Sequence, residues 1–230
     1  MNLDTLDRNF LTGLSSDMLQ QTADAHLLHQ LVIPALNRLA EAMAQDGIKL
    51  KIVSAWRGFE RQASIWQAKC EGRRAVFNSE QQVIDISKLQ GLAKLEAIML
   101  YSALPGASRH HWGTELDIYD AAAVPADYQP QLQAAEYAAG GPFHKLSLWL
   151  AQHAKTYGFF LPYQRYQGGV AAEPWHISYW PVANRCQAAY NLNLLQTTLS
   201  EHPIAEQQNV LTHLPALYER FIINICEHKT

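Results

Sequence analysis

The sequence has few cysteines and no long apolar run. Its 230 residues contain three cysteines, Cys70, Cys186 and Cys226, which is an odd number at wide spacings. These cysteines exclude a disulfide framework and a Cys-x-x-Cys metal knuckle, and free thiols favour a reducing compartment. No window approaches about 18 consecutive apolar residues, so we expect no membrane-spanning helix.

A signal peptide is not predicted either. The first ten residues, MNLDTLDRNF, show no basic start, no apolar stretch and no small-residue cleavage site. We therefore expect a cytoplasmic protein. Action in the periplasm or outside the cell would need another route of export.

The sequence also lacks an excess of either charge. Lys and Arg total 18 against 21 Asp and Glu, which gives a formal net charge of -3 and a pI of about 6.3. The one basic cluster, Arg61, Lys69, Arg73 and Arg74, is sparse, whereas proteins that bind nucleic acids or anionic membranes usually carry a concentrated basic face. We expect no nucleic-acid partner. Apolar residues make up 48% of the chain, which is ample for a globular core.

Apolar periodicity predicts a mixture of helices and short strands. Leu28, Val32, Ala35, Leu39 and Met43 recur at helical spacing, which predicts a helix over about 22–45. Strict alternation predicts a half-buried strand over 48–52. The remaining predictions are helices over 58–70, 90–102 and 143–157, strands over 115–119 and 174–180, a surface insertion over 121–140, and helices from about 183 onward.

Two segments carry imidazoles together with carboxylates: SRHHWGTELD at 108–117 and EPWH at 173–176. Zinc binds His nitrogen and Asp oxygen, and catalytic zinc sites use three protein ligands and keep one position open. His110 and Asp117 would lie too far apart along a helix, and on opposite faces of an unbroken strand. Gly113 permits a bend between them. We therefore expect a loop that carries His110 and then a strand that carries Asp117.

The EPWH segment predicts the start of a strand at Pro174, since proline cannot donate to a sheet ladder. Strand parity puts His176 on one face with Ser178. Glu173 precedes a proline, where the chain is extended, so it is poorly placed as a further ligand on that face. It could still reach a water at the metal, as a general base must.

His111 is an alternative ligand to His110. Adjacent residues of an extended chain point apart, so we expect only one of the two to bind. The remaining histidines are expected to be ordinary surface or core residues. A third segment, SAWRGFERQ at 54–62, follows the strand predicted over 48–52 directly. Taken alone, its arginine would be a surface ion-pair residue and its glutamine a solvated helix residue.

Together the three segments resemble the D-alanyl-D-alanine carboxypeptidase family of zinc peptidases, in its VanY-like branch. The family patterns S-x-x-R-x-x-x-x-Q, SxHxxGxAxD and ExWH are matched at Ser54, Arg57 and Gln62, at Ser108, His110, Gly113 and Asp117, and at Glu173, Trp175 and His176. A helix similar to the family's WLxxNAxxYGF segment is expected over 149–159. The order and spacing of these segments agree over about 48–180.

The resemblance implies an α+β fold of the hedgehog/DD-peptidase type, with a small antiparallel sheet and flanking helices. We expect a zinc peptidase domain with an N-terminal helix over 1–182, and a helical extension packed on it over 183–230. The implied function is zinc-dependent peptide hydrolysis, as a D-Ala-D-Ala-type carboxypeptidase acting on peptidoglycan-derived peptides with D-amino acids. The alternatives are a cell-wall endopeptidase of the same family and a non-catalytic, zinc-stabilised binding module.

The resemblance also implies roles for single residues. The implied zinc ligands are His110, Asp117 and His176. Glu173 would be the general base, and Arg57 would stabilise the oxyanion of the scissile carbonyl or hold a substrate carboxylate, which suits a rigid cationic fork. Ser108 and Gln62 would contact the substrate or lie around the residues that do.

Glu115 departs from the family pattern, which has a small residue at this position. Strand parity puts Glu115 on the same face as Asp117. In one interpretation it contacts the substrate and favours peptides that present a cation, such as a free amine. In a second, a cation neutralises it, with Arg109 and Arg57 as candidates. In a third, a twist or bulge of the strand turns it to solvent.

Overall fold

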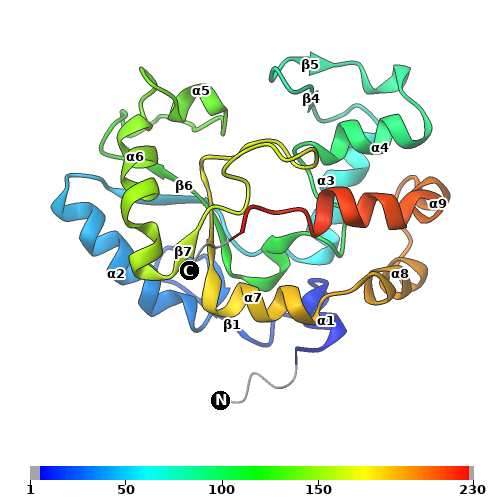
Figure 1. Cartoon of the computed structure of the whole chain (residues 1–230), viewed down its shortest axis with the longest axis horizontal. Coiled ribbons are helices and arrows are strands. Elements are labelled where there is room, and N and C mark those ends of the chain that lie inside the picture. Colours follow the sequence, from blue (N-terminus) through cyan, green and yellow to red (C-terminus); the bar gives the residue numbers. More distant parts are fainter. Residues whose placement is uncertain (1–5, 228–230) are drawn as a thin grey trace.

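Four short strands form the central antiparallel sheet of the computed structural model, which describes residues 6–227 (Figure 1). Their order is β3-β6-β8-β7. The strands of the chain are β1 Leu19–Gln21, β2 Leu27–His29, β3 Leu50–Ser54, β4 Val76–Phe77, β5 Val83–Ile84, β6 Glu115–Asp120, β7 Phe159–Phe160 and β8 His176–Tyr179. Two hairpins, β1-β2 and β4-β5, lie outside this sheet.

Most of the rest of the regular structure is helical. The α-helices are α1 Arg8–Leu11, α2 Val32–Gln45, α3 Phe59–Cys70, α4 Gly91–Met99, α5 Ala134–Tyr137, α6 His144–His153, α7 Trp180–Ala189, α8 Leu192–Glu201 and α9 Gln207–Leu217. Short 3-10 turns are η1 Ile86–Lys88, η2 Arg109–Trp112 and η3 Ala154–Tyr157, and η4 Tyr218–Ile222 is a turn of π-helix. Among the described residues no helix combines the length and the apolar character needed to cross a membrane.

β6 separates the apolar and the charged faces of the sheet. Leu116 and Ile118 point into an apolar cluster that they share with α2 and α6. Glu115 and Asp117 alternate with them and therefore point to the other face. Because β6 pairs with β8, Asp117 lies opposite His176 on the neighbouring strand. The alternation that buries the apolar residues thus brings charged residues of two strands together.

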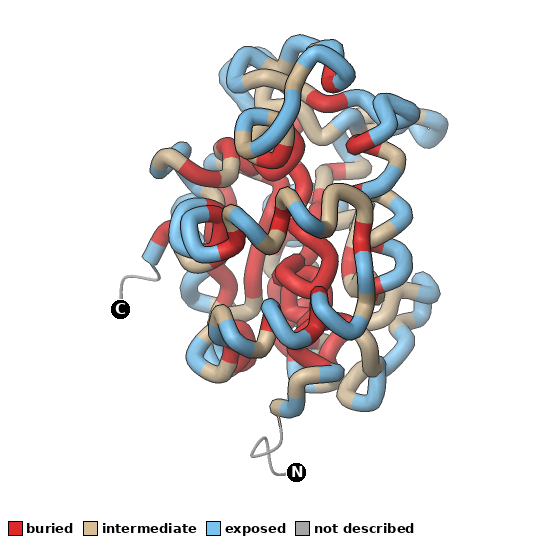
Figure 2. The backbone as a smooth tube through the Cα atoms, turned by 90° about the vertical axis from the view of Figure 1, so that its right-hand side faces the viewer, coloured by how far each residue is buried: buried red, intermediate tan, exposed pale blue. Residues whose placement is uncertain are grey.

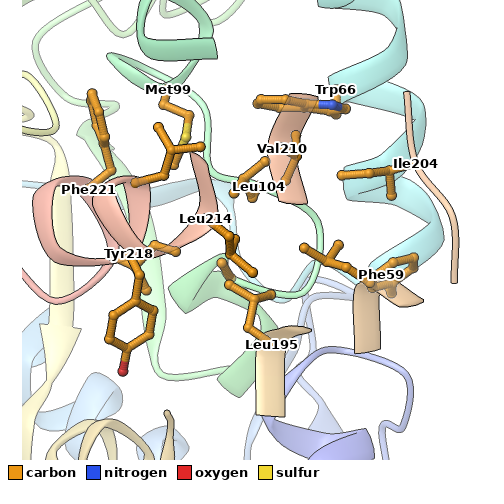
Figure 3. Close-up of a cluster of buried hydrophobic side chains, with 14 of the residues drawn as sticks. Phe59, Trp66, Met99, Leu104, Leu195, Ile204, Val210, Leu214, Tyr218 and Phe221 are labelled. Carbon is orange, nitrogen blue, oxygen red and sulfur yellow. The ribbon is translucent and has the colours of Figure 1, made fainter. Parts of the chain in front are cut away.

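A second apolar cluster joins α3 and α4 to the C-terminal helices α8 and α9, on the opposite side of the sheet from α2 and α6 (Figure 1). Figure 3 shows Trp66 of α3 and Met99 of α4 close to Val210 and Leu214 of α9. Each such side chain contributes about 1.5–3 kcal/mol when fully buried. The buried parts of the chain accordingly lie in the middle of the molecule, with exposed turns outside (Figure 2). The helices after residue 182 share this core, and a domain boundary at that residue stays a prediction.

The α+β class with a small antiparallel sheet and flanking helices is confirmed, and most predicted elements occur with shifted ends. The helix predicted over 22–45 is wrong in its first part, because α2 begins at Val32. Leu28 lies in β2 and is fully buried, so its place in the apolar pattern reflected burial and not a helix. The strand predicted to reach Trp180 ends at Tyr179, and Trp180 begins α7. Proline in the first turn favours this start of a helix.

Candidate metal centre

His110, Asp117 and His176 converge beside the charged face of the sheet. His110 lies in the turn η2, Asp117 in β6 and His176 at the start of β8. One potential ligand atom from each lies within 4.8 Å of the other two, and all three residues are buried. Among the described residues this is the one group of three or more His, Cys, Asp or Glu side chains that is close enough to hold a metal ion.

Gly113 makes the bend that the sequence requires between His110 and Asp117. It ends η2 with φ of +65°, in the left-handed region that favours glycine. A Cβ at this position would lie 2.5 Å from a Leu19 side-chain carbon and 2.7 Å from the His29 backbone nitrogen. Conformation and space therefore both require glycine, as the loop-then-strand interpretation predicts.

Outer hydrogen bonds orient both imidazoles. His110 Nδ1 lies 2.7 Å from the carbonyl oxygen of Ala55, so this nitrogen donates there and Nε2 faces Asp117 at 3.5 Å. His176 Nε2 lies 2.8 Å from Glu115 Oε2, while its Nδ1 faces Asp117 Oδ1 at 3.3 Å. A neutral ring that donates through its outer nitrogen presents an acceptor nitrogen to the centre, as metal-binding histidines do.

The Asp117 carboxylate fits a bound cation. Its Oδ1 is buried and accepts no hydrogen bond from the residues that the structure describes. A buried acceptor without a partner costs free energy unless a cation or a donor meets it. Burial opposes ionisation of Asp117, but His110, His176 and Arg57 outweigh burial and lower its pKa. Two imidazole nitrogens and one carboxylate oxygen form a donor set typical of catalytic zinc.

Glu173 lies beside the three candidate ligands. Its Oε2 is 3.2 Å from His176 Nδ1, and its side chain is 12% exposed. Burial lowers the pKa of His176, but hydrogen bonds with Glu115 and Glu173 and the charge of Asp117 raise it to about 10. The centre thus favours positive charge. Glu173, Ser108 and Arg57 line an adjoining cavity of about 340 Å³ together with the three candidate ligands.

Arg57 is held from behind by the other residues of its motif. Its Nη1 donates to Gln62 Oε1 at 2.8 Å, and its Nη2 donates to Ser54 Oγ at 3.0 Å. Gln62 is fully buried, does not line the cavity, and donates to the carbonyl oxygen of Ala103. Of the two roles expected for Gln62, these contacts fit the support of a cavity residue, and direct contact with the substrate stays a prediction.

Glu115 lies behind His176 and not in the cavity. It is fully buried, and it accepts hydrogen bonds from Arg109 Nη2 at 3.2 Å, Ser178 Oγ at 2.6 Å and Thr114 Oγ1 at 2.9 Å. Burial alone would raise the pKa of Glu115, but Arg109, His176 and Ser178 lower it to about 2. The alternative of a solvent-facing side chain is therefore wrong, and the predicted substrate contact stays a prediction, although Glu115 does not line the cavity. Neutralisation by a cation is confirmed, with Arg109 as that cation.

His111 is not part of the centre. It is fully buried, its Nδ1 bonds the carbonyl oxygen of Arg57, and its Nε2 accepts from the backbone N–H of Gly106. Burial lowers the pKa of His111 to about 3, so the ring is neutral. Both of its nitrogens are therefore used to tie loops together, which leaves none for a metal.

The sequence interpretation missed three side chains of the cavity. Tyr163 lies in a loop after β7 and packs edge-on against His176, with ring centroids 5.0 Å apart. No pattern in the sequence marks it. Lys69 and Arg74 also line the cavity. Their signal was present as the sparse basic cluster, which gave no indication that it faced the candidate ligands.

Comparison with known proteins points to one family. The family model of VanY, described as D-alanyl-D-alanine carboxypeptidase, matches residues 25–182. Two proteins of Haemophilus influenzae, both described as uncharacterized, are also similar. One is 35% identical over 122 residues, which is 52% of this chain and 93% of that protein. The other is 32% identical over 103 residues, which is 43% of this chain and 70% of that protein.

Solved structures of similar proteins share a low sequence identity with this chain. VanYB in complex with D-alanine-D-alanine is 24% identical over 80% of this chain and 88% of its own, with a TM-score of 0.49. A variant of the vancomycin resistance D,D-pentapeptidase VanY in complex with Zn(II) is 20% identical over 84% and 88%, with a TM-score of 0.47. The LD-carboxypeptidase LdcB is 21% identical over 78% and 77%, with a TM-score of 0.45.

The match to the family model starts before β2 and ends within α7. It includes all the residues that converge at the candidate metal centre, and it covers well over half of the chain. The protein therefore belongs to the VanY family of D-alanyl-D-alanine carboxypeptidases and is a peptidase.

Proposed function

We propose that the protein is a zinc-dependent carboxypeptidase that removes the C-terminal residue of peptides containing D-amino acids, with peptidoglycan-derived peptides as its substrates. The observation that carries this proposal is the convergence of His110, Asp117 and His176 beside a cavity that Glu173 also lines. Family membership supports the carboxypeptidase class. The Zn(II) and D-alanine-D-alanine named for the similar structures agree with the donor set and with a peptide substrate.

His110, Asp117 and His176 would hold the metal, and three protein ligands is the number typical of catalytic zinc. When bound, zinc supplies a Lewis acid that polarises a carbonyl and lowers the pKa of water to about 7. Glu115 and the Ala55 carbonyl would keep the two imidazoles in the required orientation, since each accepts from an outer ring nitrogen.

Glu173 would act as the general base and then as the general acid. Its carboxylate faces the cavity close to His176, where it can take a proton from the water that attacks the scissile carbonyl carbon. When the carbon–nitrogen bond breaks, the same proton passes to the nitrogen, and the leaving residue departs as an amine. The Arg57 guanidinium, already oriented by Ser54 and Gln62, would stabilise negative charge that develops on the carbonyl oxygen.

Mass spectrometry of the products tests this function. The zinc-loaded protein is incubated with muropeptides of two stem lengths, one of which ends in D-alanyl-D-alanine. We expect loss of a single C-terminal residue, and we expect this loss to stop when a chelator removes the metal. Release of internal fragments would instead identify an endopeptidase. Bound zinc without any cleavage would favour the binding module.

A further inference from the structure

One wall of the cavity carries more positive charge than the proposed chemistry uses. Lys69 lies in the last turn of α3 and Arg74 in the loop that follows, and both line the cavity together with Arg57. The Lys69 side chain is buried: the residue is 8% exposed, while Arg74 lies at the surface. Lysine is almost never buried to this extent unless a counter-charge pairs with it.

Among the described residues no carboxylate pairs directly with Lys69. Between residues 6 and 227 neither the Lys69 nor the Arg74 side chain forms an ion pair or a hydrogen bond. Two other cations of the same region do have partners, because Arg73 pairs with Glu71, and Lys94 pairs with Glu206 at 2.6 Å. Lys69 and Arg74 thus face the cavity without a partner, whereas Arg57, which also lines it, is held by Ser54 and Gln62.

Burying an unpaired cation costs free energy, and a second cation nearby adds to the cost. Burial and the charges of Arg74 and Arg57 lower the pKa of Lys69 to about 8, while the Glu173 charge acts in the opposite direction. Lys69 remains mostly protonated at neutral pH. An anion that enters the cavity would relieve both the lost hydration and the repulsion among these cations.

We propose that Lys69 and Arg74, next to Arg57, form a subsite that binds a carboxylate of the peptide substrate. The subsite rests on the proposed peptidase function and names a feature of its substrate. The surrounding wall is largely apolar, with Ile65, Phe77 and Met99 beside the cations. Such a wall suits an amino-acid side chain next to the carboxylate, and the cavity of about 340 Å³ has the size of a small-molecule site.

The carboxylate has two possible sources in such a peptide. One is the α-carboxylate of the C-terminal residue that is removed. The other is a free carboxylate on a residue before the scissile bond, as in a γ-linked glutamate. Both present the same planar anion to an ammonium and a guanidinium group. Three substrates separate the sources: the parent peptide, its C-terminal amide, and a peptide whose internal carboxylate alone is converted to an amide.

The test measures kcat/KM of the zinc-loaded full chain on these three substrates. Lys69→Met removes the charge but keeps an apolar side chain of similar length, and Lys69→Arg keeps the charge. Lys94→Met is the matched control, since it changes a partly buried lysine outside the cavity. We expect the wild type to prefer one carboxylate over its amide by about 10–100-fold, as hydrogen bonds between charged groups predict.

Lys69→Met should lose most of the wild-type preference for the carboxylate over its amide, while Lys69→Arg and Lys94→Met should retain this preference. Zinc content measured on each variant separates this result from a damaged metal centre. If Lys69→Met keeps the wild-type preferences, or loses activity equally on all three substrates, the subsite is wrong. If the wild type cleaves no peptide, the proposed function fails, and calorimetric binding of the parent peptide and its amides to the same variants decides the subsite separately.

Discussion

Two groups of charged residues lie near the candidate ligands, and they differ in their partners. On the same face of the sheet as Asp117, Arg109 and Glu115 pair at 3.2 Å, and Glu115 also accepts from His176. Arg109 donates to Ser178 as well and to Gln187 of α7. In the cavity, Lys69 and Arg74 have no such partners among the described residues. The first group is paired within the protein, whereas in the second the buried Lys69 ammonium meets an opposite charge directly only if a ligand binds.

The difference has an energetic consequence that mutations can measure. Removing one member of a buried, hydrogen-bonded charge pair leaves the other uncompensated, which typically costs 3–5 kcal/mol. Removing an unpaired buried cation removes a cost that the folded state already carries. Removing a charge should therefore lower the stability of the protein in the first group and raise it in the second. The effect on activity depends on whether the removed side chain contacts a candidate ligand or the cavity.

Glu173 lies between the two groups, next to His176 and within electrostatic reach of Lys69. We expect Glu173→Gln to lower kcat by about 10²–10⁴-fold, because the amide cannot take a proton from water. Zinc content by elemental analysis should stay at the wild-type level, whereas His176→Ala should lose most of its zinc. Normal turnover of Glu173→Gln at normal zinc content would move the role of general base to another residue.

Glu115→Ala should have the largest effect on stability. It leaves the Arg109 guanidinium buried without its carboxylate, so we expect the free energy of unfolding to fall by about 3–5 kcal/mol in urea denaturation. Because His176 loses its outer partner, zinc affinity measured by chelator competition should fall by about 10–100-fold.

The double variant Glu115→Ala with Arg109→Met tests whether the effect comes from the pair. It should recover part of the stability, since no uncompensated charge remains, but it should not recover zinc affinity. The single variant Arg109→Met completes the comparison. If the double variant loses as much stability as the two single variants together, Arg109 and Glu115 act independently, and the contrast between the two groups disappears.

Lys69→Met should change stability in the opposite direction. The pKa of Lys69 lies near 8 in the folded protein, against 10.5 for an ordinary lysine side chain. Protonation therefore disfavours folding, and Met should raise the free energy of unfolding by about 1–3 kcal/mol at pH 7. The gain should be complete below about pH 8 and should vanish as the pH approaches about 10.5, where lysine is neutral in the unfolded chain too. A variant less stable than the wild type at pH 7 would show that Lys69 has a stabilising partner.

The sequence predicted the candidate ligands better than it predicted their surroundings. Spacing and Gly113 were enough to infer a loop that carries His110 and a strand that carries Asp117. Strand parity also placed Glu115 correctly on the face of Asp117. Its position behind His176 depends on the β6-β8 register, which pairs residues about 60 positions apart and cannot be read from either segment alone.

Long-range packing also explains the other misses. Lys69 faces a cavity that Phe221 and Ile222 of the C-terminal turn η4 help to line, so its burial depends on residues far along the chain. The start of α2 was misplaced for a similar reason, because Leu28 is buried through the β1-β2 hairpin. Apolar periodicity shows that a residue is buried, but it does not show which element buries it.

The smallest expected effect is on pH dependence, and it tests the unpartnered group directly. Lys69 faces Arg74 and Arg57, which stay charged, and Glu173, which acts on every substrate alike. The ratio of kcat/KM for the preferred carboxylate and its amide therefore isolates Lys69. We expect this ratio to be constant below about pH 7 and to fall by at most about tenfold by pH 9, as the ammonium group loses its proton. Lys69→Arg should hold the ratio constant over the same range, because arginine remains charged. A wild-type ratio that stays flat, or that falls equally in Lys69→Arg, would assign the carboxylate preference to Arg57 and Arg74 without Lys69.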